Sequence, residues 1–168
     1  MATITPTYGT EVALTVTNLH SLTDGSWWAS AAIDNEGTDD AMDAILGGTF
    51  EMNNSSAPTD SATIDVYVAA RWGDGTNDFQ ASIGTGLPGE GTKTEGTNFM
   101  QENLILAASV VVPATTSAQV KWSAGSVAAL FGGLMPPAWC VVVENNSGQT
   151  LSANDNDVTY VPVKYDST

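Results

Sequence analysis

The chain has 168 residues, of which 42% are hydrophobic, and this is enough for one packed domain rather than a disordered coil. Four Lys and Arg residues stand against 19 Asp and Glu residues, which gives a formal net charge of −15. So few basic residues cannot neutralise many phosphates, so we expect neither nucleic-acid binding nor attachment to an anionic membrane.

The first residues, MATITP, contain no basic cluster, and no segment approaches the ~20 apolar residues of a membrane span. We therefore expect a soluble protein that is made in the cytoplasm. Cys140 is the only cysteine and lies in the apolar run WCVVV, which predicts a buried, inert thiol and excludes an intramolecular disulfide.

The first part of the chain has the alternating, β-branched pattern of strands. We predict strands over residues 11–17, 28–34, 43–52, 63–70 and 79–83. A short capped helix over 38–46 is the alternative for the start of the third segment, and Gly47 and Gly48 indicate a bulge within it. The segment 53–60 is predicted to be a loop, 73–77 a hairpin turn, and the glycine-rich segment 84–98 a long surface loop.

In the second part, further strands are predicted over 104–112, 118–122, 138–144 and 158–163. A helical turn over 126–131 is closed by two glycines. Pro162 cannot donate to a ladder, so we expect the last strand to lie at an edge or to leave the sheet there.

These short, regularly spaced strands favour an all-β fold, namely an antiparallel two-sheet sandwich that is jelly-roll-like and carries one or two short helical turns. Residues 1–8 are predicted to be an N-terminal arm, and 9–168 a single β-sandwich domain.

The residues that support catalysis or metal binding are scarce. His20 is the only histidine, and we expect it to be a surface or structurally bonded imidazole. The segments 73–78 and 154–157 offer oxygens to calcium, but neither matches an ordered calcium loop, and Asp, Asn and Gly are the ordinary residues of turns. We predict no catalytic, cofactor-binding or metal-binding residues.

Apolar residues in two segments are candidates for a protein interface. Of the adjacent Trp27 and Trp28, only one can face a given side of a sheet, so one indole is either exposed as an anchor or covered by loops of the same chain. The apolar, proline-rich loop over residues 131–137 offers similar anchors. The candidate partner interface is Ile4, Tyr8, Trp27, Trp28, Phe131, Leu134 and Met135.

Two segments carry a resemblance to known proteins. They are residues 18–35, NLHSLTDGSWWASAAIDN, and residues 131–148, which include FGGLMPPAW and VVVENNSG. Together they resemble a group of small virion structural proteins of tailed bacteriophages, most like capsid decoration (cement) proteins. The resemblance brings no catalytic residues.

The resemblance implies a non-enzymatic protein that binds the outside of the phage capsid and reinforces contacts between major capsid subunits. It implies the major capsid protein as partner, a homo-oligomer such as a trimer, and a place on the virion surface. The alternatives are a tail or baseplate component and a carbohydrate-binding β-sandwich module. A small glycoside hydrolase comes third, since acidic residues are numerous.

Overall fold

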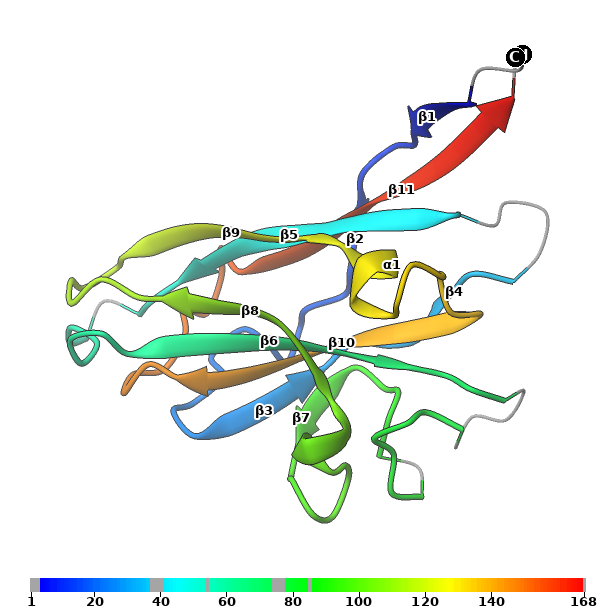
Figure 1. The fold of residues 1–168 in the computed structure, drawn as a ribbon. Coiled ribbons are helices and arrows are strands. Elements are labelled where there is room, and N and C mark those ends of the chain that lie inside the picture. The colour runs from blue at the N-terminus through cyan, green and yellow to red at the C-terminus, as the bar shows by residue number, and fades with distance from the viewer. Residues whose placement is uncertain (1–3, 37–40, 54, 74–77, 85, 168) are drawn as a thin grey trace.

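The structure is a computed structural model that describes residues 4–36, 41–53, 55–73, 78–84 and 86–167. Two antiparallel sheets contain nearly all of its regular secondary structure (Figure 1). The first sheet contains β1 (Ile4–Tyr8), β2 (Val12–Ala13), β5 (Asp43–Glu51), β9 (Gln119–Ser126) and β11 (Asp157–Ser167). The second contains β3 (Ser26–Ala29), β4 (Ile33–Asp34), β6 (Thr63–Ala70), β7 (Gly91–Lys93), β8 (Ile105–Val111) and β10 (Ala138–Asn146). A helical turn, α1 (Val127–Leu130), and a 3-10 turn, η1 (Gln101–Asn103), complete the described elements.

The strand order is that of a jelly roll. β2, β11, β5 and β9 are neighbours in the first sheet, and β3, β10, β6 and β8 are neighbours in the second. The chain pairs β2 with β11, β3 with β10, β5 with β9 and β6 with β8. Along the sequence, each of these pairs encloses the next one. This confirms the predicted all-β, jelly-roll-like sandwich.

The main core lies between the sheets and follows the period of two. Ile64, Val66 and Val68 of β6 are fully buried in it, as the alternation in 63–70 predicts. Trp28 and Trp139 are the largest fully buried side chains in the same cluster.

A second apolar cluster covers the outer face of the second sheet. It contains Trp27, Tyr67, Phe79, Leu87, Phe99, Cys140 and Val142. The surface-loop prediction for 84–98 is therefore wrong in part: Leu87 is fully buried, and β7 extends the sheet by pairing with β3. The segment contains many glycines and polar residues and only a few large apolar ones, so its sequence pattern does not indicate that one side of it is buried.

Several predicted bounds differ from the structure. The strand over 11–17 is reduced to β2, and the segment 28–34 is split into β3 and β4. The segment 79–83 makes only isolated bridges with Arg71 and Phe99, so the predicted returning strand is wrong. The alternative helix over 38–46 is wrong for its described part, since β5 begins at Asp43; residues 38–40 and 74–77 lie outside the described residues. α1 and its Ser126 cap confirm the predicted helical turn.

The register shift expected at Gly47 and Gly48 is present between Leu46 and Gly47, but the extra residue is Ala124 on β9. The glycines instead allow close strand approach: a Cβ on Gly48 would lie 2.2 Å from the Asp157 carbonyl oxygen.

Of the two expectations for the last strand, the edge position at Pro162 is wrong, because β11 is paired with β5 on one side and with β1 and β2 on the other. Departure from the sheet is confirmed one residue later, since the pairing with β5 ends at Val163 and only β1 accompanies β11 beyond it. The Gly9 amide donates to the Pro162 carbonyl at 2.8 Å. In an antiparallel ladder the N–H and C=O of one residue point to the same side, so the missing N–H faces the gap between β1 and β2. The ladder to β5 loses nothing.

Candidate functional site

The most prominent surface feature is a two-stranded ribbon formed by β1 and the last part of β11, which projects beyond the sandwich (Figure 1). Its register pairs Pro6 with Tyr165 and Thr7 with Lys164. Directly opposite residues share a face, so Ile4, Pro6 and Tyr8 lie on the same face as Tyr165. We call these four residues the apolar ribbon face.

The apolar ribbon face is exposed, with 71% of Ile4, 64% of Tyr8 and 50% of Tyr165 accessible to solvent. The opposite face is polar, and there Thr7 Oγ1 donates to Asp166 Oδ2 at 2.7 Å. Two-stranded ribbons are only marginally stable alone. An amphipathic ribbon with its apolar side in water is therefore a candidate docking element.

The outer edge of β1 is blunted. Because Gly9 and Pro162 form a hydrogen-bonded pair, alternation along the ladder makes Pro6 and Tyr165 a non-hydrogen-bonded pair. The proline nitrogen thus faces the free edge, where it cannot donate to another strand. The geometry favours contact through the apolar ribbon face over strand addition at this edge.

The two tryptophans are not surface anchors. Trp28 is fully buried in the main core and Trp27 is 5% exposed in the second cluster, where it meets Phe99 at 4.9 Å and Tyr67 at 5.6 Å between ring centroids. The prediction of an exposed indole is wrong, and the alternative of coverage by the same chain is correct.

The remaining candidates divide in the segment after α1. Phe131 and Met135 are half-buried and pack against the main core, whereas Leu134 is 77% exposed. Leu134 and Met135 line a hollow of about 610 Å³ together with Met42, which is 56% exposed. Neither Ile4 nor Tyr8 lines this hollow, so its lining does not join all the predicted interface residues.

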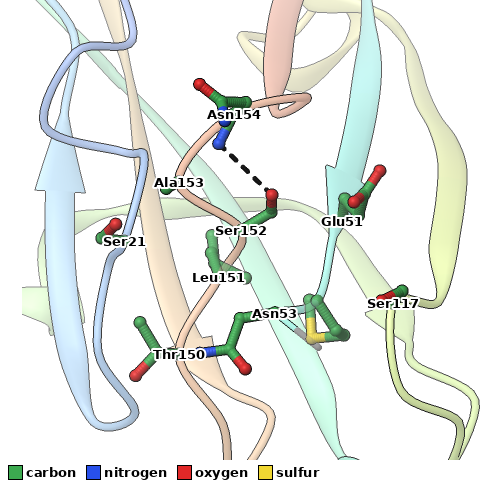
Figure 2. A pocket seen from close by; sticks show the side chains of 10 residues that line it. Ser21, Glu51, Asn53, Ser117, Thr150, Leu151, Ser152, Ala153 and Asn154 are labelled. Carbon is green, nitrogen blue, oxygen red and sulfur yellow. Dashed lines mark hydrogen bonds between the residues drawn. The ribbon is translucent and has the colours of Figure 1, made fainter. Parts of the chain in front are cut away.

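A smaller and more polar pocket of about 350 Å³ lies where four connections meet, those between β2 and β3, β5 and β6, β8 and β9, and β10 and β11 (Figure 2). We call it the four-loop pocket. Figure 2 shows that its polar side chains come from all four connections or from the adjoining strand ends. Its polar lining includes Ser21, Glu51, Asn53, Ser117, Thr150 and Ser152.

Backbone hydrogen bonds join the loops around this pocket. The Ser21 amide donates to Ser152 O at 3.0 Å, and the Ser152 amide donates to Glu51 O at 2.7 Å. The Asn53 amide donates to Thr150 O at 3.2 Å, and its own carbonyl accepts from the Ser117 amide at 3.3 Å. Residues separated by up to about 130 positions are thereby fixed to one another, so the pocket is part of the folded framework.

Cys140 and His20 are the only residues of their kinds in the sequence. Cys140 is buried, which confirms that part of the prediction, and burial raises the pKa of its thiol to about 12. His20 is half-buried, with Nδ1 3.5 Å from Asn156 Nδ2. Among the described residues, no group of three or more His, Cys, Asp or Glu could hold a metal ion. Likewise, no described helix is both long and apolar enough for a membrane span.

Asp65 and Glu144 lie directly opposite each other on β6 and β10. Burial, and then the Asp65 and Glu95 charges, raise the pKa of Glu144, although hydrogen bonds from Asn146 and Tyr67 partly oppose this. Both carboxylates have polar neighbours, since Ser109 Oγ donates to Asp65 Oδ1 at 2.5 Å and Tyr67 donates to Glu144 Oε2 at 3.4 Å.

Sequence reasoning missed the four-loop pocket and the role of Glu90. The Glu90 carboxylate accepts from Trp28 Nε1 at 3.0 Å, from the Asn18 amide at 2.8 Å and from Asn18 Nδ2 at 2.6 Å. Burial raises its pKa, but the hydrogen bonds outweigh burial and the net pKa lies below the ordinary value. No local sequence pattern predicts the four-loop pocket or the hydrogen bonds of Glu90, because each depends on residues far apart in the sequence.

Comparison with protein-family models, with curated proteins and with solved structures finds no match to this chain.

Proposed function

We propose that this protein is a non-enzymatic virion structural protein of a tailed bacteriophage, which binds the outside of the capsid and reinforces contacts between major capsid subunits. The observation that carries the proposal is the apolar ribbon face, a projecting docking element with 71% of Ile4 and 64% of Tyr8 exposed. The resemblance of residues 18–35 and 131–148 to phage virion proteins supplies the biological setting.

Charge argues for a partner other than a second copy at the ribbon. Each copy carries a net charge of −15, so two copies repel each other unless the contact is strongly favourable. A capsid surface with an apolar groove and basic rim complements both the ribbon and the acidic sandwich. Contacts that are individually weak become sufficient when the symmetric shell repeats them. In this proposal any homo-oligomer, such as a trimer, forms around a capsid symmetry axis and not through the ribbon.

The test compares the two faces of the same ribbon. The variant Ile4→Ser/Tyr8→Ser changes the apolar ribbon face, and Thr5→Ala/Thr7→Ala changes the polar face as a matched control. Each protein is mixed with assembled capsids that lack it and is then sedimented. Truncating a docked aromatic commonly costs about 2 kcal/mol, so we expect at least tenfold weaker binding for the first variant and near wild-type binding for the control.

Equal capsid binding by both variants would show that the apolar ribbon face is not part of the interface. Binding of the wild-type protein to purified tails, with none to heads, would contradict the capsid assignment and favour the tail or baseplate alternative. Electron microscopy of particles carrying labelled protein gives the same distinction without any substitution.

A further inference from the structure

We propose that the four-loop pocket binds one unit of a neutral, polyhydroxylated ligand, that is, a single sugar ring. This goes beyond the proposed capsid role and is independent of it, because the pocket lies at the loops that join the two sheets and involves none of the ribbon residues. Its volume of about 350 Å³ is at the small end of ordinary ligand sites.

A buried side-chain amide, hydrogen-bonded to the backbone of three lining residues, fixes the shape of the pocket. Asn156 is 3% exposed, and its Nδ2 donates to Ser152 O at 2.8 Å and to Asn154 O at 3.0 Å. Its Oδ1 accepts from the Glu51 amide at 2.9 Å. One side chain therefore holds the β10–β11 connection against the end of β5, so that little ordering is needed when a ligand binds.

Two residues that line the pocket have strained backbones. Ser21 has φ of 62° and Ser117 has φ of 54°, in the left-handed region that residues with a side chain seldom adopt. They come from different connections, and the inter-loop hydrogen bonds hold both in place. Strain that the surrounding fold maintains is frequent at binding sites.

The lining selects the ligand class. Among the described residues, the hydroxyls of Ser21, Ser117 and Thr150 have no hydrogen-bond partner, so each is available as a donor and as an acceptor. Glu51 adds a carboxylate, whose contact with a described side chain is a long one of 3.4 Å from Gln119 Nε2. Sugar hydroxyls, which both donate and accept, complement this set.

Other ligand classes fit less well. An anion would meet the Glu51 carboxylate in a chain of net charge −15. Among the described residues of the lining, a divalent cation would find this single carboxylate, which is too few for tight binding. None of the described residues that line the pocket is aromatic, so a sugar would bind without stacking, with a dissociation constant on the order of 1 mM. Many copies on one particle would strengthen such binding to a polysaccharide.

The experiment titrates the isotope-labelled, full-length protein separately with glucose, galactose, mannose and N-acetylglucosamine, and with sialic acid as the anionic comparison. Amide chemical shifts report where each sugar binds. We expect at least one neutral sugar to saturate shifts at Ser21, Ser117 and residues 150–154, with sialic acid at least fivefold weaker. Mannan and dextran, tested by gel retardation, distinguish a polysaccharide end from a free sugar as the source.

Substitutions then test the assigned groups. Glu51→Gln and Thr150→Val keep side-chain size, and each should weaken binding at least fivefold, whereas Glu102→Gln on the exposed η1 turn should not. The inference is overturned if none of the neutral sugars shifts the pocket amides, or if binding survives both substitutions unchanged. The wild-type shift map decides the question even if a variant fails to fold.

Discussion

Replacing Glu90 by alanine removes the clamp that fastens the glycine-rich segment to the sandwich. The Glu90 carboxylate accepts one hydrogen bond from the core residue Trp28 and two from Asn18. In Glu90→Ala, the Trp28 indole N–H keeps its place in a fully buried side chain but loses its acceptor. A buried donor without an acceptor destabilises the folded state, because it loses its hydrogen bonds to water on folding and forms none within the protein.

The magnitude follows from the individual contacts. Leaving a buried donor unsatisfied costs about 1–3 kcal/mol, and hydrogen bonds to a charged group contribute about 1.5–3 kcal/mol each before screening. Asn18 is exposed, so its two bonds are discounted for solvent screening. We expect a total loss of about 2–3 kcal/mol, which corresponds to a fall in Tm of roughly 5–10 °C for a domain of this size.

The assay is urea unfolding followed by tryptophan fluorescence, with the exposed Glu95 of the same segment as the control. In the described residues, no hydrogen bond is made by the Glu95 side chain, so Glu95→Ala should change stability by less than about 0.5 kcal/mol. If the two variants unfold at the same urea concentration, Glu90 does not anchor the segment. Because the folded-state pKa of Glu90 is lowered, the ionic part of its contribution is present above its unfolded pKa of about 4.3 and is lost as the pH falls through the folded value.

Three further predictions concern the sheets and the thiol. Gly48→Ala should destabilise the protein by about 3 kcal/mol, because the added Cβ would lie 2.2 Å from the Asp157 carbonyl oxygen; a urea midpoint equal to wild type would disprove the close approach. Glu144→Gln should stabilise the protein by about 0.2–1 kcal/mol at pH 7, since it removes one of two carboxylates placed directly opposite each other on β6 and β10. Because the pKa of Glu144 is raised in the folded protein, the repulsion between the two carboxylates destabilises the wild type above that pKa and disappears as the pH falls. The stability gained by Glu144→Gln should therefore vanish near pH 3 in thermal unfolding. A gain in stability that does not depend on pH would contradict the charge argument. With its pKa raised to about 12, native Cys140 should react with a disulfide reagent at pH 8 orders of magnitude more slowly than the urea-unfolded chain, and equal rates would show that the thiol is accessible.

Periodicity predicted the sheets well where one face of a strand meets the main core. The alternation in 63–70 identified β6 and its buried face of Ile64, Val66 and Val68. It failed where turn-like residues carry little pattern. In 84–98, glycines satisfy the local criteria for a loop, yet this segment contains β7 and the buried Leu87.

The candidate interface divided for a related reason. Alternation states that Trp27 and Trp28 face opposite sides of a sheet, and they do, one in each apolar cluster. What covers Trp27 is a segment more than 50 residues away, which includes Phe79 and Phe99. Nothing local to β3 indicates that covering segment, so burial of both indoles was one of two open alternatives.

The sequence by itself determined the chemistry available to this chain: its strong acidity, its single cysteine and histidine, and the strands whose period of two fits a sandwich. Tertiary structure decided which apolar residues remain in water, so that Tyr8 is exposed on the ribbon while Trp27 is not. It also built the four-loop pocket, whose walls come from four connections. The physical reason is that local periodicity fixes the direction of a side chain, whereas its burial depends on distant segments that the fold brings against it.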